Sequence, residues 1–219
     1  MEKRVKIDGA IFDLDGTLLD SMCVWDNLDR RYLESIGIEP TEELENELRC
    51  ASLRRAAELL RQRYELKFSE EEIMAGINKL VEDMYFYTVQ PKEGVPEFLE
   101  HLRSEGVKMC VATATDRYQA EAALERCGLL SYFDGIFTCT EMGVGKEDTA
   151  IFRAALELLG TETSRTFVFE DALHAIESAK KLGLKVAAVK EKSAEREEGR
   201  IVAISDIYIE SFKEAADFF

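Results

Sequence analysis

The stretch from Asp13 to Thr17, with the sequence DLDGT, carries two carboxylates, a glycine and a hydroxyl directly after the apolar residues 7–12. Successive side chains of a strand point to opposite faces, so the two carboxylates can serve one site only if the backbone turns at once. Gly16 permits such a turn because glycine adopts conformations that other residues avoid. Carboxylates at the end of a buried strand suit a hard cation and a phosphate, although the Asp-x-Asp-Gly pattern also occurs in calcium-binding loops and in turns.

Other polar residues lie at or just after the ends of predicted strands, or in the loops between them: Thr113, Lys146, Glu170 and Asp171. Ligands of an open parallel sheet bind beyond the carboxyl ends of its strands, so we expect these side chains to meet Asp13 and Asp15 at one edge. Carboxylates gathered there would raise one another's pKa values and repel a phosphate. Magnesium would resolve both problems, because it binds carboxylate and phosphate oxygens together.

The elements that must position these residues follow from the spacing of apolar side chains. From about residue 90 onwards, apolar strands alternate with amphipathic helices, many of which end at a glycine. The pattern predicts strands over residues 107–113, 135–138, 166–169, 185–189 and 207–209. It predicts helices over residues 96–105, 118–127, 149–159 and 172–182, and a C-terminal helix that begins at Ser211. Such alternation requires a parallel sheet with helices on both faces, and the charged residues 191–200 are interpreted as a solvated loop.

Residues 21–88 show helical spacing of apolar side chains and no strand pattern. A capping box formed by Ser69 and Glu72 opens one of the helices predicted there. We therefore expect an α/β core domain made of residues 1–20 and 89–219. An all-helical insertion of three or four helices, residues 21–88, interrupts this core.

Composition limits the classes of partner and compartment. A formal net charge of -16 argues against binding to nucleic acid or to an anionic membrane, because either needs a basic surface. No apolar run approaches the length of a membrane span. Five scattered cysteines without a Cys-x-x-Cys pair indicate reduced thiols, and two histidines are too few for a zinc site of ordinary spacing. The expectation is a cytoplasmic protein that is a monomer or a weak homodimer.

Four segments resemble, in the same order, the four motifs of the haloacid dehalogenase (HAD) superfamily of phosphohydrolases: residues 13–17, 109–113, 146 and 168–171. The resemblance covers residues 1–219 and implies a Rossmann-like, three-layer parallel-sheet core. It also identifies the insertion as a C1 cap domain like that of the phosphoglycolate phosphatase and β-phosphoglucomutase branch. A cap that closes over a substrate excludes water, and its hinges are expected near residues 19–21 and 88–92.

The residue types and the resemblance together assign two catalytic roles. Asp13 is the expected nucleophile, which takes the phosphoryl group as an aspartyl-phosphate. Asp15 is the expected acid–base group, which protonates the leaving oxygen and then deprotonates the attacking water. The predicted activity is magnesium-dependent hydrolysis of a phosphate monoester on a small phosphorylated metabolite.

The resemblance also implies ligands for Mg²⁺ and for the phosphate. The expected metal ligands are the side chain of Asp13, the main-chain carbonyl of Asp15, and the acidic pair Glu170 and Asp171. Lys146, the Thr113 hydroxyl and the Ala114 N–H are expected to bind phosphate oxygens. Thr113 has a plainer interpretation as the last residue of a strand. Lys146 is assigned from motif order, because the family often has Lys-Pro-x-Pro-Asp where this chain has Lys-Glu-Asp-Thr-Ala.

Three arginines are candidates for binding the remote end of the substrate: Arg49, Arg54 and Arg117. The plainer interpretation of each is an ordinary solvated arginine on a helix. A β-phosphoglucomutase is an alternative function, but the histidine of the mutase cap is absent near Trp25 and its arginine is displaced. A non-catalytic phospho-acceptor module is a second alternative, which the helical insertion and Asp15 both oppose.

Overall fold

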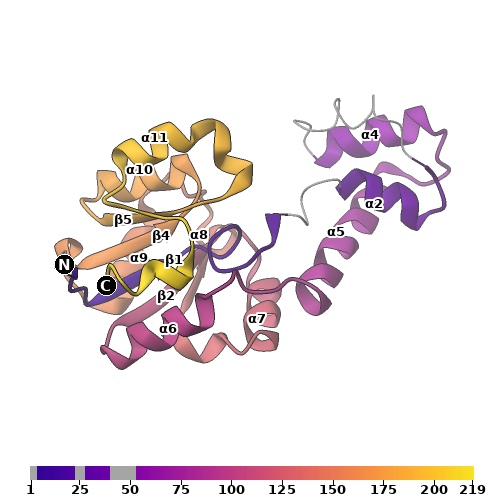
Figure 1. The fold of residues 1–219 in the computed structure, drawn as a ribbon. Helices are drawn as coiled ribbons and strands as arrows, with labels where there is room; N and C mark the ends of the chain where they lie inside the picture. The colour runs from indigo at the N-terminus through magenta and orange to yellow at the C-terminus, as the bar shows by residue number, and fades with distance from the viewer. Residues whose placement is uncertain (1–3, 23–27, 40–52) are drawn as a thin grey trace. The chain divides into compact units, whose positions relative to one another are not determined.

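The computed structural model describes residues 4–22, 28–39 and 53–219, and the chain forms two compact units (Figure 1). The core unit consists of Met1–Ser21 and Val89–Phe219, and the inserted unit consists of Met22–Thr88. The chain therefore leaves the core unit after its first strand, builds the inserted unit, and returns to complete the core.

The core unit is built on a six-stranded sheet with the strand order β3-β2-β1-β4-β5-β6. Its strands are β1 (Gly9–Phe12), β2 (Lys108–Thr113), β3 (Ile136–Thr138), β4 (Thr166–Glu170), β5 (Lys185–Val189) and β6 (Ile207–Ile209). All neighbouring strands are parallel, and Ile11 of β1 lies opposite Cys110 of β2 and Val168 of β4. Every residue of β1 is buried, as expected for a central strand covered on both faces.

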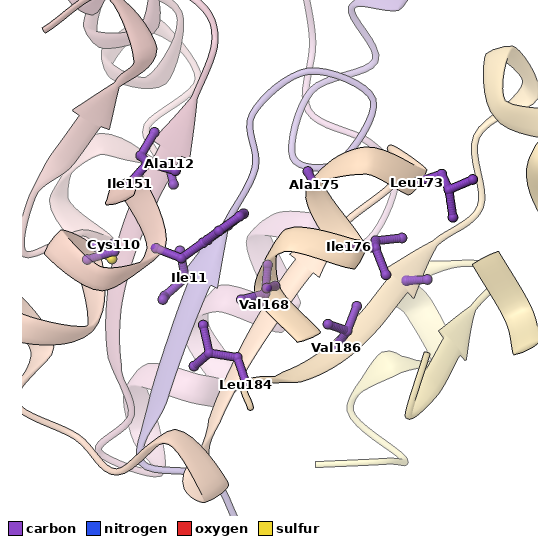
Figure 2. Packing of buried hydrophobic residues seen from close by; sticks show 14 of the residues in the cluster. Ile11, Cys110, Ala112, Ile151, Val168, Leu173, Ala175, Ile176, Leu184 and Val186 are labelled. Atoms are coloured by element: carbon purple, nitrogen blue, oxygen red, sulfur yellow. The ribbon is translucent and has the colours of Figure 1, made fainter. Parts of the chain in front are cut away.

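Helices cover one face of the sheet through an aliphatic cluster. The helices of the core unit are α6 (Val95–Ser104), α7 (Arg117–Arg126), α8 (Cys139–Met142), α9 (Ala150–Leu159), α10 (Leu173–Lys181), α11 (Glu198–Ile204) and α12 (Phe212–Ala215). Short 3-10 helices are η1 (Leu130–Tyr132), η2 (Thr163–Arg165) and η3 (Lys192–Glu197). Alternate strand residues point to opposite faces, and Ile11, Cys110 and Val168 share a cluster with Ile151 of α9 and Ile176 of α10 (Figure 2).

The opposite face of the sheet carries aromatic side chains. Phe12, the neighbour of Ile11, stacks on Phe169 with the ring centroids 4.4 Å apart. Phe98 of α6 covers this pair, with its centroid 5.5 Å from that of Phe169, and it also contacts Phe212 of α12 at 5.4 Å. The two packed faces confirm the predicted three-layer α/β architecture.

The prediction of a solvated loop over residues 191–200 was wrong. Residues 192–197 form η3, and residues 198–200 begin α11. The carboxylate of Glu191 accepts hydrogen bonds from the N–H groups of Lys192 and Ser193, and Ile201 is buried in the aliphatic cluster beside α10. No apolar period is visible in this stretch because Ile201 is the only buried side chain of α11. The short helix α8, begun by Thr138, was also missed.

The described part of the inserted unit contains the helices α2 (Leu28–Ser35), α4 (Leu53–Arg63) and α5 (Glu70–Tyr87). They share a separate apolar cluster whose buried members include Leu33, Leu60 and Ile77. The predicted capping box is present, because the Ser69 hydroxyl accepts from the Glu72 N–H and the Glu72 carboxylate accepts from the Ser69 N–H. Among the residues described in either unit, no helix is long and apolar enough to cross a membrane.

The aromatic face yields a stability prediction. Phe98 is 1% exposed and contacts four other phenylalanine rings, so Phe98→Ala should lower the free energy of unfolding by about 3–5 kcal/mol. Phe218, which is 37% exposed, provides the control, and Phe218→Ala should change it by less than about 1 kcal/mol. Urea unfolding followed by circular dichroism measures both. Equal losses in the two variants would contradict the assignment of Phe98 to the core.

Candidate active site

A tight turn follows β1 at the carboxyl edge of the sheet. Asp13, the first residue after β1, is 5% exposed, and its N–H donates to Phe169 O at 2.9 Å, which extends the pairing with β4. Beyond Asp13 the backbone closes on itself: the Leu19 N–H donates to Leu14 O at 2.8 Å, and the Gly16 N–H donates to Leu19 O at 3.0 Å. The turn thus brings the side chains after β1 back to the strand end.

Gly16 is required in this turn for two reasons. Its φ of +79° lies in the left-handed region that favours glycine. A Cβ atom at this position would also lie 2.6 Å from Asp171 Oδ2. The absence of a side chain therefore lets the loop after β4 approach the turn, where Thr17 Oγ1 donates to Asp171 Oδ1 at 3.1 Å.

Three buried carboxylates meet at this edge. Asp13, Glu170 and Asp171 each offer one oxygen, and these oxygens lie within 4.8 Å of one another. Burial and then the charge of Glu170 raise the pKa of Asp13 well above its usual range, and the same two causes raise the pKa of Asp171 to about 7. Carboxylates that are this close and this buried are the oxygen donors that suit a hard divalent cation, so the residues present fit such an ion.

Lys146 supplies the positive charge of the cluster. Its side chain is 6% exposed, and Nζ donates to Asp13 Oδ1 and, at 2.8 Å, to Glu170 Oε2. Burial lowers the pKa of Lys146, but the two carboxylates outweigh burial and raise it, so the ammonium stays charged. The other oxygen of Glu170 accepts from the N–H groups of Asp171 and Ala172. The charge of Lys92 also lowers the pKa of Asp171, so two ammonium groups act on three carboxylates and the cluster stays short of positive charge.

Asp15 has a different environment from Asp13. One carboxylate oxygen accepts from Ser21 Oγ at 2.6 Å, and the other accepts from Thr115 Oγ1 at 2.5 Å. Both hydroxyls belong to buried residues. Sequence reasoning missed Ser21 and Thr115, although each lies only a few residues from a motif, because a hydroxyl alone does not show which way it points. The two hydroxyls hold Asp15 in a defined orientation beside the cluster of three carboxylates.

Thr113 ends β2 and is fully buried, as its strand position requires. Its Oγ1 accepts from the Thr115 N–H at 3.0 Å, which shapes the loop that follows β2. Ala114, between them, is exposed. Thr113 and Ala114 thus lie at the carboxyl end of the strand next to β1, where the sequence placed them.

The three arginines predicted to bind substrate belong to different parts of the chain. Arg117 begins α7 and pairs with Glu141 at 2.5 Å and with Glu121 at 3.3 Å. Arg54 belongs to α4 of the inserted unit, and Arg49 lies outside the described residues. A role in substrate binding stays a prediction for all three, and Trp25, which bears on the mutase alternative, also lies outside the described residues.

The fold and the site together define a class of protein. In an open parallel sheet the carboxyl edge is where ligands bind, and a buried set of acids around one lysine at that edge is typical of an enzyme site. Residues 10–189 match the family model of the haloacid dehalogenase-like hydrolases, and the chain belongs to this family.

Individual relatives support the same branch. A phosphorylated carbohydrates phosphatase of Thermotoga maritima is 30% identical over 178 residues, which cover 81% of this chain and 82% of that protein. A phosphoglycolate phosphatase of Aquifex aeolicus is 29% identical over 183 residues, with 81% and 82% covered. A solved structure from T. maritima, provisionally named a β-phosphoglucomutase, has a TM-score of 0.82 at 26% identity and covers 96% of this chain and 97% of that chain.

These comparisons confirm the predicted family and the phosphoglycolate phosphatase and β-phosphoglucomutase branch. The two curated relatives described above are phosphatases. Together with the family match, this makes the chain a phosphate monoester hydrolase of the HAD superfamily, and the mutase alternative is not favoured.

The close approach at Gly16 gives a prediction with a matched control. Gly16→Ala should lower the midpoint of urea unfolding and remove most of the phosphatase activity, because a Cβ would displace Asp171. Gly183 has a similar φ of +77°, but nothing lies within 4 Å of its Cβ position. Gly183→Ala should therefore show only the cost of the backbone conformation, about 1 kcal/mol, and keep its activity. Similar activity in both variants would show that Asp171 tolerates displacement.

Proposed function

We propose that the protein hydrolyses the phosphate monoester of a small phosphorylated metabolite, with Mg²⁺ as cofactor and an aspartyl-phosphate on Asp13 as intermediate. The observation that carries the proposal is the position of Asp13, buried between the Lys146 ammonium and the acidic pair Glu170 and Asp171 at the sheet edge. The relative that acts on phosphorylated carbohydrates and the one that acts on phosphoglycolate support a substrate of this size and chemistry.

The residues proposed to hold Mg²⁺ are the side chains of Asp13, Glu170 and Asp171, together with the main-chain carbonyl of Asp15. The deficit of positive charge around the three buried carboxylates supports this assignment. When bound, Mg²⁺ supplies positive charge that offsets the repulsion between the carboxylates and the phosphate.

In the first half-reaction an oxygen of Asp13 attacks phosphorus, and the bond between phosphorus and the ester oxygen breaks. Asp15 gives a proton to that leaving oxygen, which departs as an alcohol. In the second half-reaction Asp15 takes a proton from water, whose oxygen attacks phosphorus and releases phosphate from Asp13. Because both steps need the same group, the hydroxyls of Ser21 and Thr115 serve the reaction by fixing the orientation of Asp15.

Lys146 holds the Asp13 carboxylate in place for attack and opposes the rise in its pKa that burial and Glu170 cause. Its ammonium also offsets charge on the phosphoryl oxygens. The Thr113 hydroxyl and the Ala114 N–H are assigned as donors to those oxygens. Hydrogen-bond donors that are fixed before the substrate binds need no reorganisation during the reaction.

The inserted unit, Met22–Thr88, is proposed to act as the cap over the substrate, with Arg49, Arg54 and Arg117 as candidates for binding its remote end. We propose a cytoplasmic enzyme that works as a monomer or weak homodimer and binds neither nucleic acid nor membrane, in keeping with the net charge of -16.

The nucleophile assignment predicts the outcome of one substitution. Asp13→Asn should abolish phosphate release, because an amide does not attack phosphorus, whereas Asp217→Asn, at an exposed residue of the core unit, should keep full activity. The measurement is phosphate release from sugar phosphates, phosphoglycolate, nucleotides and an aryl phosphate, with and without Mg²⁺. Turnover by Asp13→Asn at a rate near that of the unchanged protein would exclude Asp13 as the nucleophile. An unchanged protein that releases no phosphate from any compound would overturn the proposed function itself.

The metal assignment predicts a change in stability that needs no substrate. A ligand at 100 times its dissociation constant stabilises the fold by about 2.7 kcal/mol, so saturating Mg²⁺ should raise the Tm of the unchanged protein. Asp171→Asn should remove most of that rise, and Asp217→Asn should leave it intact. The experiment is thermal unfolding after treatment with EDTA, with and without added Mg²⁺. A full rise in Tm for Asp171→Asn would place the ion elsewhere.

A further inference from the structure

The two linkers that join the units pair with each other inside the core unit. The outgoing linker, residues 18–20, and the return linker, residues 90–92, form what we call the linker pair. The Asp20 N–H donates to Gln90 O at 2.9 Å, the Lys92 N–H donates to Leu18 O at 2.9 Å, and Leu19 forms an antiparallel bridge with Pro91. The return linker is therefore joined to the chain that leaves the active site.

The linker pair also closes the turn that carries Asp15. Leu19 accepts from the Gly16 N–H and donates to Leu14 O, so the same residue that bridges to Pro91 holds both sides of the turn. A displacement of the return linker would pass through Leu19 to the backbone on either side of Asp15.

Lys92 anchors the return linker to the rest of the sheet. Its Nζ donates to Lys190 O at 2.9 Å and pairs with Glu191 Oε2 at 2.6 Å. The other oxygen of Glu191 accepts from the Lys192 N–H at 2.8 Å, at the start of η3. The lysine thus connects the linker pair to the segment that follows β5, along one wall of a cavity of about 990 Å³ in the core unit.

Burial separates this contact from an ordinary surface ion pair. The side chains of Lys92 and Glu191 are 17% and 10% exposed, whereas the nearby pair of Lys213 and Glu93 is 59% and 75% exposed. Exposed pairs contribute little, because water screens them and both side chains must be ordered. Two partners, Lys190 O and Glu191 Oε2, hold the Lys92 ammonium in one geometry. Removing Lys92 or Glu191 would leave the charge of the other partly buried.

We propose that Lys92 is a positioning residue for the phosphatase reaction. Through Glu191 and the linker pair, it holds the turn at Asp15 in the orientation that proton transfer requires. This inference rests on the proposed function, because it assigns Lys92 a role through the acid–base group of that reaction.

The proposal predicts a loss that depends on the leaving group. An alkoxide departing from a sugar phosphate needs the proton of Asp15, whereas the phenolate departing from 4-nitrophenyl phosphate is stable without it. The value of kcat/KM reports the steps up to cleavage of the ester bond. A misplaced Asp15 should therefore lower kcat/KM for the sugar phosphate much more than for the aryl phosphate.

The experiment compares Lys92→Met, Lys92→Arg, Glu191→Gln and the control Lys213→Met on both substrates. Misplacing a catalytic group by a fraction of an ångström should lower kcat/KM for the sugar phosphate about tenfold in Lys92→Met and Glu191→Gln. The loss for the aryl phosphate should be less than about threefold. Lys92→Arg keeps the pair and should recover most of the rate, and Lys213→Met should match the unchanged protein. The double variant Lys92→Met with Glu191→Gln should be no slower than either single variant.

Glu191→Gln distinguishes loss of the Lys92–Glu191 ion pair from loss of the Lys92 charge. The variant removes the ion pair but keeps the charged Lys92, and its amide oxygen can still accept from the Lys192 N–H. It also carries the test if Lys92→Met does not fold. Equal losses on the two substrates, or activity of Glu191→Gln equal to that of Lys213→Met, would overturn the positioning role. Absence of phosphate release by the unchanged protein would instead overturn the proposed function.

Discussion

The central constraint on this structure is the burial of like charges at one edge of a sheet. An ion moved out of water loses several kcal/mol of hydration even after the protein relaxes, and Asp13, Glu170 and Asp171 are all buried within reach of one another. Lys146 offsets part of this cost by contacting two of the three. The negative charge that remains suits this edge to a divalent cation. The burial that costs free energy therefore also makes these residues fit a metal ion.

The sheet can accommodate the buried charges at this edge because side chains pack against its central strands from both faces. Neighbouring residues of β1 belong to different layers: Ile11 packs in the aliphatic cluster beneath α9 and α10, and Phe12 packs in the aromatic layer beneath α6. The same alternation applies to Val168 and Phe169 in β4. Because β1 and β4 are adjacent and fixed in this way, Asp13 and Glu170 lie close together at the sheet edge. Their positions depend on the strands and not on the path of a loop.

The difference between positions fixed by strands and positions that depend on loops explains what could be predicted from the sequence. Residues that directly follow or end buried strands, such as Asp13, Thr113 and Glu170, could be placed because parallel strands share one carboxyl edge. The partners of Asp15 could not be predicted, because the positions of the Ser21 and Thr115 hydroxyls depend on the paths of two loops. α11 was missed since a single buried side chain within a charged stretch leaves no period to detect. Helix and strand bounds, in contrast, differed from the structure by one or two residues where the apolar period was clear.

The turn after β1 places two identical side chains, Asp13 and Asp15, in different surroundings. Asp13 continues the strand and enters the buried cluster beside the Lys146 ammonium, whose charge opposes the rise in the pKa of Asp13 that burial and Glu170 cause. Asp15 lies two residues further on, and the turn directs its carboxylate to two hydroxyls beside the cluster of three carboxylates. The charge of Asp15 still raises the pKa of Asp13, so the two carboxylates interact electrostatically although they contact different groups. A sharp turn at Gly16, which no side chain obstructs, therefore gives two carboxylates within three residues different hydrogen-bond partners.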